Sequence, residues 1–479
     1  MASSDSDTQR NDTPEQSAVG RQPFRALAYI GCVDLLDPKA PQLVWLDNLD
    51  RLTIGRPKPL WSIPEGRRDD IVVERTDGAV RVRVRDGRVS GLHATLDRQG
   101  ERWRIRDEGS TNGTVVNGRP VTEHVLASGD IVEMGHTFWR YIEYLPLQPG
   151  LFARKEFVAF GPTRTVSPAL HEALALLRLH APGKDHSLIL GDTGAGKEIA
   201  AAQVHAWSER AGKCHVINCA TIPAQTAEGH LFGWVKGAHT GAQRDQEGHV
   251  EAAHGGTLVL DEIGDLSFDL QAKLLRVAEE GEMYRLGDVR PRRVDVRIVA
   301  VTHRDLPAMV HQGTFREDLY GRLAKHITRL PALRNRPEDI GGLVAQFLRE
   351  CEGGADLGIA PLAMRRLLAY SWPQNVRQLG SVIHEAAGLA RAAGVVKLQH
   401  VTLPAVAPPA EPAHEAGTDA ESGLPRGDAE FCAGLDASLR RQGGNVAAVA
   451  RDLGIKREVL YRRLRACRLD PRSYRGPRP

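Results

Sequence analysis

A glycine-rich segment followed by a lysine is the first part of the chain whose residue types could do chemistry. The stretch "SLILGDTGAGKE" (187–198) runs from apolar residues into a Gly-x4-Gly-Lys pattern. Glycines let backbone amides wrap phosphate oxygens, and the lysine ammonium reaches the outer phosphates. Glu198 stands where Ser or Thr usually follows the lysine. The pattern predicts a nucleotide-binding loop made by Gly191, Asp192, Thr193, Gly194, Ala195, Gly196, Lys197 and Glu198.

A pair of carboxylates follows a second apolar run, "GGTLVLDEIGDL" (255–266). Asp261 is placed to coordinate Mg²⁺ and Glu262 to polarise an attacking water, which are the two tasks of ATP hydrolysis. One such motif can arise by chance. Two in this order, each following an apolar strand, predict an α/β P-loop ATPase with ATP and Mg²⁺ as its cofactors.

The elements that must position these residues belong to a chain of several domains. Its 479 residues, 42% hydrophobic and 26% charged, suit about three globular domains. Residues 1–22 are polar, and residues 402–428 mix Pro, Ala, Gly and acids, so we expect a disordered tail and a linker. Folded domains are then expected at 23–145, 155–400 and 429–470.

Composition also bears on location and partners. No run approaches about 18 apolar residues, and the amino terminus lacks an apolar signal-peptide core. The six cysteines show neither zinc-ligand spacing nor a disulfide framework. We therefore expect a cytoplasmic protein without a membrane partner. Residues 440–479 hold twelve Lys or Arg and three Asp or Glu, a net charge of +9 against +3 for the whole chain, which favours a polyanion partner for this end.

The first folded segment is dominated by short alternating runs. "AVRVRVRDGRV" (79–89) puts valines on one face and arginines on the other, a pattern typical of an antiparallel β-sandwich. The arginines alone indicate no more than a solvated basic face. More specific is the succession "IGR" (54–56), "SGLH" (90–93) and "STNGTVVNG" (110–118), which resembles the forkhead-associated (FHA) domain, a β-sandwich that binds phosphothreonine peptides.

This resemblance implies roles for several loop residues. Arg56 and Ser90 would hold the phosphate, because a guanidinium fork and a hydroxyl suit a phosphate dianion, and Asn112 would bond the peptide backbone. Gly91 stands where the family often has a basic residue, which bears on peptide preference. The residues that would brace the loops are Gly55 and His93.

The central segment resembles the AAA+ ATPase domain of bacterial sigma-54-dependent transcription activators nearly continuously over 155–400, with a helical lid at about 330–400. The motifs that carry the resemblance, besides the two above, are "LFGWVKGAHTGA" (231–242), "FREDLYGRL" (315–323) and "YSWPQNVRQL" (370–379). It implies that Asn218 restrains Glu262 in a nucleotide-dependent switch. Arg377 would sense the nucleotide from the lid. The implied arginine fingers, reaching a neighbouring subunit and so requiring a ring that is usually a hexamer, are Arg316 and Arg322.

The same resemblance implies a loop that presses on sigma-54, formed by Gly237, Ala238, His239, Thr240, Gly241 and Ala242. The chain departs from the family pattern at four positions near this loop and the nucleotide. His239 replaces a Phe, Val235 a common Glu, His303 a sensor Asn, and Gln374 a common Gly. These departures bear on coupling and partner more than on ATP binding.

The carboxyl end carries "NVAAVARDLGIKREVLYRRLRA" (445–466), with apolar residues at helical spacing on both sides of Gly454. This pattern predicts an all-α helix-turn-helix and resembles the Fis-type DNA-binding unit usual at this family's carboxyl end. Lys456 and Arg457 would face base edges, while the later arginines would meet phosphates. The predicted DNA contacts are Lys456, Arg457, Tyr461, Arg462 and Arg463.

Together these patterns favour an ATP-dependent activator of the sigma-54 RNA polymerase holoenzyme. It would bind enhancer-like DNA and respond to a phosphothreonine-containing protein. Two alternatives remain open on the sequence. One is a sigma-54-independent DNA-binding regulator with a degenerate ATPase, and the other is a phosphothreonine-dependent signalling scaffold.

Overall fold

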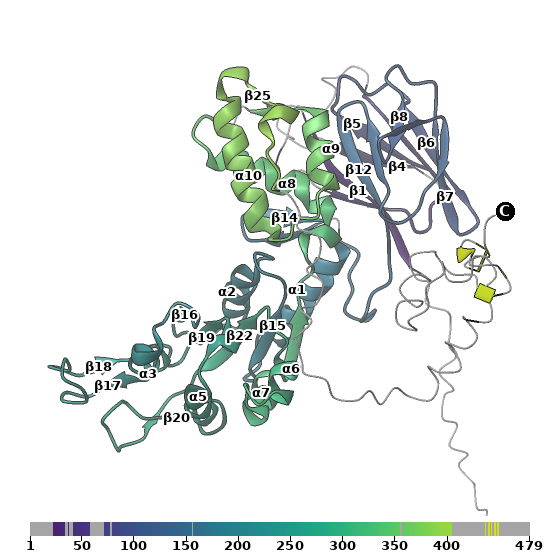
Figure 1. Ribbon diagram of the computed structural model, residues 1–479. Helices are drawn as coiled ribbons and strands as arrows, with labels where there is room; N and C mark the ends of the chain where they lie inside the picture. The colour runs from purple at the N-terminus through teal and green to yellow at the C-terminus, as the bar shows by residue number, and fades with distance from the viewer. Residues whose placement is uncertain are drawn as a thin grey trace, which may run out of the picture. The chain divides into compact units, whose positions relative to one another are not determined.

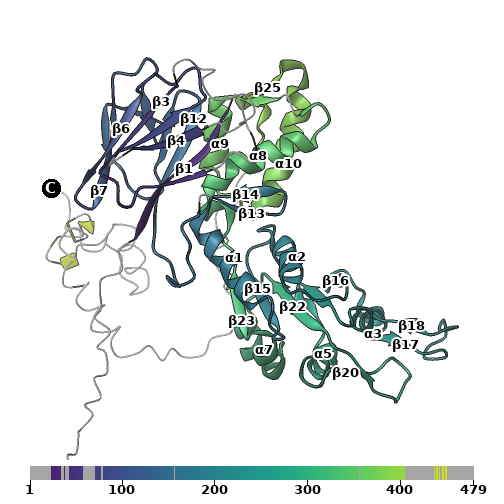
Figure 2. The same cartoon turned by 180° about the vertical axis from the view of Figure 1, so that it is seen from behind.

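The computed structural model describes residues 23–33, 37, 42–57, 71–76, 79–155, 157–354 and 357–404, and eight positions between 436 and 449. Contacts divide the chain into two compact units, Met1–Val406 and Ala407–Pro479. Within the first unit, Figures 1 and 2 show a β-sandwich, an α/β block and a group of lid helices. This arrangement matches the multidomain fold class predicted above.

The β-sandwich consists of two six-stranded sheets. In sheet order, the first contains β2 (Gln42–Trp45), β1 (Phe24–Cys32), β12 (Thr137–Tyr144), β11 (Ile131–Met134), β8 (Thr114–Val116) and β9 (Arg119–Val121). The second contains β10 (Glu123–Val125), β7 (Arg102–Asp107), β6 (Ala94–Gln99), β3 (Arg51–Gly55), β5 (Ala79–Val84) and β4 (Ile71–Thr76). Val80, Val82 and Val84 point into the core between the sheets, as their alternation predicted. The expected antiparallel order needs one correction, because β3 and β5 pair in parallel.

The α/β block contains a five-stranded parallel sheet. In sheet order its strands are β16 (Cys214–Asn218), β19 (Thr257–Asp261), β22 (Arg297–Thr302), β15 (Ser187–Leu190) and β23 (His326–Arg329). The central strands β19 and β22 are buried on both faces, which explains why they read as nearly continuous apolar runs, whereas the edge strands β16 and β23 are partly exposed. On β19, Val259 packs with α1 and α2, while Leu258 and Leu260 pack on the opposite face with α3 and α5.

Among the described residues, the α/β block has seven helices, which pack around this sheet or lie beyond it. They are α1 (Pro168–His180), α2 (Lys197–Trp207), α3 (Ala224–Phe232), α4 (His249–Ala252), α5 (Phe268–Glu280), α6 (Leu306–His311) and α7 (Glu317–Leu323). Two short hairpins project beyond α3 and α5 in Figure 1. Their strands are β17 (Gly233–Trp234) with β18 (Gln246–Glu247), and β20 (Glu282–Met283) with β21 (Arg292–Arg293).

The lid is built from α8 (Ile340–Glu350), α9 (Pro361–Ala369) and α10 (Asn375–Ala390), with the parallel pair β24 (Gly358–Ile359) and β25 (Val395–Val396). A further hairpin, β13 (Val158–Phe160) with β14 (Thr163–Thr165), lies against α8. The lid core also contains Ile30, Val33 and Phe138 of the β-sandwich. A Cβ atom on Gly341 would overlap the Ile30 carbonyl, so this glycine lets α8 approach β1.

The second unit is described at few positions. Leu439 and Val449 are buried there, and Arg440 pairs with Asp436 at 2.9 Å, one helical turn away. The predicted DNA-contacting residues, Lys456 to Arg463, lie outside the described residues. Among the helices that are described, none is both long enough and apolar enough to cross a membrane.

Candidate nucleotide and phosphopeptide sites

Four of the parallel strands end at one edge of the α/β sheet, and the predicted nucleotide residues lie there. The glycine-rich loop follows β15, Asp261 ends β19, Thr302 ends β22, and Asn218 ends β16. Ligands of open α/β sheets bind outside the carboxyl ends of the strands. One cleft is lined by Thr193, Gly194, Gly196, Lys197, Glu198, Asn218, Asp261, Glu262 and Arg377.

The glycine-rich loop has the backbone geometry of a phosphate cradle. Gly194 and Gly196 adopt φ values of 75° and 102°, which side chains strongly disfavour. The buried Lys197 ammonium donates hydrogen bonds to the carbonyls of Gly191 (2.9 Å) and Asp192 (3.2 Å). Burial lowers the pKa of Lys197, although three nearby carboxylates oppose this change. The loop thus presents backbone amides and one cation to the same small volume.

Asp261 and Glu262 point into this cleft in different environments. Asn218 Nδ2 donates to Asp261 Oδ2 at 3.1 Å, whereas Lys197 Nζ lies 3.9 Å from Glu262 Oε1. Burial and the neighbouring Glu262 and Glu198 carboxylates raise the pKa of Asp261. A divalent cation at Asp261 would offset this repulsion, so the residue fits Mg²⁺ coordination.

His303 holds Glu262 in place through hydrogen bonds, and the sequence did not predict this contact. Glu262 Oε2 accepts hydrogen bonds from His303 Nδ1 (2.8 Å), the His303 backbone N–H (3.3 Å) and Thr302 Oγ1 (3.2 Å). Burial raises the pKa of Glu262, but the His303 bonds outweigh it and the net pKa is lowered. In this structure Asn218 contacts Asp261, and His303 makes the Glu262 contact that the resemblance implied for Asn218.

The lid closes on the glycine-rich loop through the start of α10. Asn375 is fully buried, and its side chain donates to the Thr193 carbonyl (2.9 Å) and accepts from the Leu333 backbone N–H (2.7 Å). A Cβ atom on Gly194 would overlap the Gln374 carbonyl. Arg377 reaches over the cleft, with its side chain 62% exposed and 3.9 Å from the Glu198 carboxylate.

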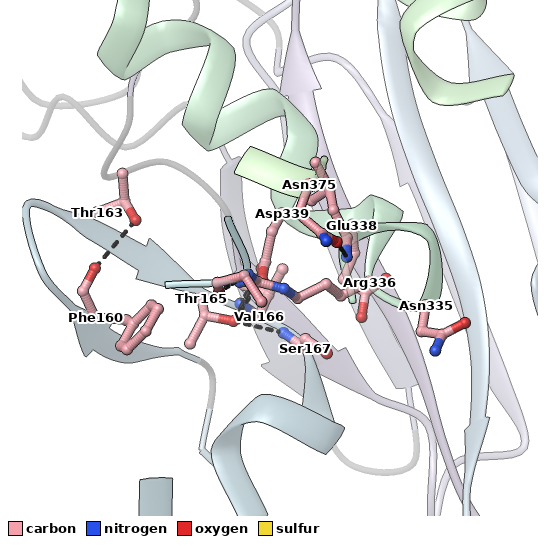
Figure 3. Close-up of polar contacts among 12 residues, drawn as sticks. Phe160, Thr163, Thr165, Val166, Ser167, Asn335, Arg336, Glu338, Asp339 and Asn375 are labelled. Atoms are coloured by element: carbon pink, nitrogen blue, oxygen red, sulfur yellow. Dashed lines mark hydrogen bonds and ion pairs between the residues drawn. The ribbon is translucent and has the colours of Figure 1, made fainter. Parts of the chain in front are cut away.

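Buried charges form a second wall of the site, shown in Figure 3. Asp339 accepts from Thr165 Oγ1 (2.8 Å), the Val166 backbone N–H (2.9 Å) and Arg336 Nη1 (3.2 Å). Arg336 Nη2 also donates to the Ala195 carbonyl in the glycine-rich loop at 2.9 Å. The adjoining cavity is lined in part by the apolar side chains of Phe160, Ile199, Leu343, Phe347 and Val376, which suits a flat nucleotide base.

Of the two predicted finger arginines, Arg316 directly precedes α7 and Arg322 lies on it, and neither lines this cleft. Arg316 pairs with Asp318 at 2.7 Å, and Arg322 pairs with Glu279 at 2.7 Å. Both guanidinium groups are partly exposed. They remain available to contacts from outside the subunit.

The segment "GAHTGA" forms the loop between β17 and β18. Its ends are joined by a hydrogen bond from the Gly237 backbone N–H to the Ala242 carbonyl (2.8 Å). His239 is exposed, and its ring packs edge-on against Trp234 at 5.3 Å between centroids. The β20–β21 loop lies alongside through a 3.1 Å bond from Val235 N–H to the Leu286 carbonyl, and it carries the 89% exposed Val289.

The predicted phosphopeptide residues gather on loops of the β-sandwich. Arg56 donates from its backbone N–H to the Ser90 carbonyl (2.8 Å) and from Nη1 to the Gly87 carbonyl (3.2 Å). Ser90 Oγ accepts from the Thr111 backbone N–H at 3.1 Å. Asn112 Nδ2 donates to the Arg88 carbonyl at 2.7 Å. Arginine, serine and asparagine therefore share one partly exposed surface.

A buried histidine braces these loops from beneath. His93 Nδ1 accepts from the Ser90 backbone N–H (3.1 Å), so its Nε2–H donates to the Gly113 carbonyl (3.1 Å). Burial lowers the pKa of His93, which favours this neutral form. Gly55 has no room for a Cβ atom because the Gly91 carbonyl lies against it. The structure thus brings all five predicted residues of this site together.

The sequence analysis missed two carboxylates that fix loops of the sandwich, Asp86, which is buried, and Asp107, which is partly buried. Asp107 accepts from the Ser110 hydroxyl and the Thr114 hydroxyl, each at 2.7 Å. Asp86 accepts from the His136 backbone N–H (2.7 Å) and from Thr137 Oγ1 (2.9 Å). The turn residues Ser, Thr and Asn near them were the available signal, since such side chains often fix loops. The described residues contain no cluster of three or more His, Cys, Asp or Glu side chains suited to a metal ion.

Fold and sites define a P-loop ATPase with a helical lid and an attached β-sandwich. Four family models match the chain in this order: FHA domain at 52–135, sigma-54 interaction domain at 164–328, AAA+ ATPase lid domain at 334–417, and bacterial regulatory protein of the Fis family at 434–466. The chain therefore carries an FHA domain, followed by a sigma-54 interaction domain, an AAA+ lid domain and a Fis-family domain.

Individual relatives resemble the chain over part of their length. The anaerobic nitric oxide reductase transcription regulator NorR of Aeromonas salmonicida is 42% identical over 320 residues, which are 64% of this chain and 63% of that protein. NorR of Klebsiella pneumoniae is 41% identical over 337 residues, 65% of each. A crystal structure of NtrX from Brucella abortus in complex with ATP is 34% identical, with a TM-score of 0.46, over 64% of this chain and 69% of that one. The chain spans a little under two thirds of the length of the curated relatives it matches.

Proposed function

We propose that this chain hydrolyses ATP to ADP and phosphate in the cytoplasm and uses the free energy to remodel a sigma-54 RNA polymerase–promoter complex. The observation that carries the proposal is the convergence of Lys197, Asp261 and Glu262 at one sheet edge under the lid. A cation for the outer phosphates, a carboxylate for Mg²⁺ and a second carboxylate for water are the parts that phosphoryl transfer to water requires.

In this proposal each residue has a separate role. Lys197 neutralises the outer phosphates, and Asp261 holds Mg²⁺, which supplies charge neutralisation when bound. Glu262 accepts the proton of the attacking water, with its free oxygen Oε1 on the side of Lys197. Arg377, on the first turn of α10, meets the nucleotide from the lid.

We further propose a ring, by family resemblance a hexamer, in which Arg316 and Arg322 complete a neighbour's site. Their position at the start of α7 and within it, outside the lining of their own cleft, supports this assignment. Mixing an Arg322→Ala subunit with a Lys197→Ala subunit should restore hydrolysis that neither shows alone. No rescue in rings shown by sizing to be mixed would remove the fingers from the proposal.

The partners follow from the remaining parts of the chain. The exposed loop at His239 is proposed to contact sigma-54, since its small residues build no core and its only exposed ring stands at the tip. The surface at Arg56, Ser90 and Asn112 is proposed to bind a phosphothreonine-containing protein. The helix-turn-helix is proposed to bind enhancer-like DNA through Lys456 and Arg457, on the strength of its sequence and its basic charge.

A steady-state ATPase assay on the purified full chain tests the proposal. Turnover that requires Mg²⁺ and disappears in Lys197→Ala is expected. A chain that binds no ATP and has no turnover would instead favour the phosphothreonine-dependent scaffold. The departures at His239 and His303 favour a second candidate, a sigma-54-independent DNA-binding regulator, and this candidate would hydrolyse little ATP and open no sigma-54 promoter.

A further inference from the structure

One face of the β-sandwich is buried against the lid, although the two are far apart in the sequence. Ile30, Val33 and Phe138 share a hydrophobic core with lid helices, and the Ile359 backbone N–H donates to the Val33 carbonyl at 3.2 Å. Figures 1 and 2 both show β1 and β12 beside α8 and α9. The FHA domain is therefore in direct contact with the element that covers the nucleotide cleft.

Within the described part of the chain, three ion pairs join the β-sandwich domain to the lid, and one of them is Arg349 of α8 with Asp37 at 3.3 Å. Arg365 of α9 pairs with Glu133 of β11 through two bonds of 2.6 and 2.8 Å. Arg140 of β12 pairs with Glu338, whose side chain is only 2% exposed, and also donates to the Asn335 carbonyl at 3.4 Å. Glu338 directly precedes Asp339, so the Arg140–Glu338 pair joins the buried charges in Figure 3.

The charge balance of that cluster depends on the FHA domain. Glu338 and Asp339 are two adjacent carboxylates in a nearly dry environment, and two arginines, Arg140 and Arg336, face them. Burial raises the pKa of Glu338, Arg140 opposes that rise, and Asp339 adds to it. A buried carboxylate that loses its cation is strongly destabilising or must find another partner.

We propose that Arg140, a residue of the FHA domain, is a positioning residue for the ATP site. With Arg140 on Glu338, Arg336 is left to bond Asp339 and the Ala195 carbonyl, and these bonds hold the glycine-rich loop in its cradle shape. Without Arg140, Arg336 is the remaining arginine of this cluster, and its shift toward the unpaired Glu338 would release the Ala195 carbonyl. This inference rests on the proposed ATPase function and adds a residue to its site.

The strand that carries Arg140, β12, is also connected through hydrogen bonds to the loops of the phosphopeptide surface. Asp86, which accepts from the backbone N–H of Arg88 at 2.8 Å, also holds His136 and Thr137 at the start of β12. Arg88 in turn offers its carbonyl to Asn112. A phosphopeptide bound at Asn112 and Ser90 would thus contact a loop that is bonded to the strand carrying Arg140. This gives the input a contiguous physical route to the nucleotide loop.

The test compares ATP affinity and turnover in full-length variants. Arg140→Gln should raise KM for ATP, and Kd for a fluorescent ATP analogue, by about fivefold or more, the usual scale of coupling between sites. The kcat at saturating ATP should stay within about twofold, because the reacting groups are untouched. Arg140→Gln/Glu338→Gln, which removes both charges, should return KM to the parent value. Arg365→Gln is the matched control, since it breaks a different ion pair of the interface, Arg365–Glu133, and should leave KM within about twofold.

Several outcomes would overturn the inference. An unchanged KM and Kd in Arg140→Gln would do so, and so would failure of the double variant to recover. An equal rise in Arg365→Gln would assign the effect to domain docking in general. A parent chain that binds no ATP analogue contradicts the proposed function itself, whereas a parent that binds it with no dependence on Arg140 contradicts only this inference.

Discussion

The molecule contains two candidate phosphate sites that use different chemical groups to hold the phosphate. In the FHA domain, side chains on loops between β-strands form the site, and Asn112 is exposed. In the ATPase domain, backbone amides of a single loop and one buried lysine form it, at the carboxyl edge of a parallel sheet. The first surface can be reached by a macromolecule, and the second is a cleft beneath a lid.

This difference follows from what each site does with the phosphate in our proposal. A phosphothreonine is recognised and released unchanged, so charge and hydrogen-bond donors on an open surface suffice. A γ-phosphate is transferred to water, which demands a base, a metal-binding carboxylate and groups fixed before the reaction. Accordingly, the nucleotide site has two carboxylates, Asp261 and Glu262, whereas Arg56, Ser90 and Asn112 include none.

The two sites should differ most clearly when the proposed base, Glu262, is removed from the nucleotide site. Glu262→Gln should still bind ATP but hydrolyse it at least ~100-fold more slowly, the scale of general-base loss. Quench-flow or coupled-assay turnover, together with binding of a fluorescent ATP analogue, measures both quantities. Turnover equal to that of the parent would exclude Glu262 from the mechanism.

The corresponding change at the phosphopeptide site removes its cation, the Arg56 guanidinium. Arg56→Ala should weaken binding of a phosphothreonine peptide by at least ~10-fold, because a charge-assisted bond to phosphate is lost. Calorimetry with a phosphorylated and an unphosphorylated peptide gives the difference. Arg85→Ala, an exposed arginine on the same domain, is the matched control and should bind as the parent does. Binding that survives in Arg56→Ala contradicts the assignment of the site.

A smaller effect is expected at His303, which holds Glu262 by its second oxygen. His303→Ala should lower kcat roughly 10-fold with little change in KM, because Glu262 loses a hydrogen bond that orients it while the nucleotide contacts stay. His303→Asn keeps a donor and should recover most of the rate. His311→Ala, an exposed histidine on α6, serves as control. If the Ala and Asn variants are equally slow, the donor role is wrong.

The smallest effect on hydrolysis is expected at the tip loop. His239 contacts Trp234 and lines no part of the nucleotide cleft, so His239→Ala should leave the ATPase rate within about twofold. The same variant should lose promoter opening, and His239→Phe, which buries more apolar surface, should match or exceed the parent. An ATPase rate that collapses in His239→Ala would show that the loop serves the nucleotide site.

Local sequence patterns predicted the parts of the nucleotide site that lie within single turns, whereas the phosphopeptide residues were implied by the resemblance to the FHA domain. The glycine-rich loop and the Asp261-Glu262 pair each follow a buried strand, so their placement at one sheet edge needed no knowledge of distant contacts. The fold class was predicted for the same reason, since alternation and apolar runs are local signals. The parallel pairing of β3 with β5 was missed, because alternation says nothing about strand direction.

The contacts between remote segments could not be predicted. His303 and Glu262 are 41 residues apart, Thr165 and Asp339 are 174 apart, and Arg140 and Glu338 are 198 apart. In a sequence Arg140, Glu338 and Asp339 look like ordinary surface positions, because charged side chains are rarely buried. The pairing of β19 with β22 brings His303 to Glu262, and the packing of the lid brings the other two pairs together. The DNA contacts from Lys456 onward stay a prediction.

Promoter opening is the measurement that tests the central claim most directly. The full chain, sigma-54 RNA polymerase and a promoter with an upstream site for the chain should give open complexes with ATP. They should give none with a non-hydrolysable analogue, and none when Glu262→Gln replaces the parent. Opening that does not depend on hydrolysis would contradict the account, and so would a parent ring that hydrolyses ATP yet never opens the promoter.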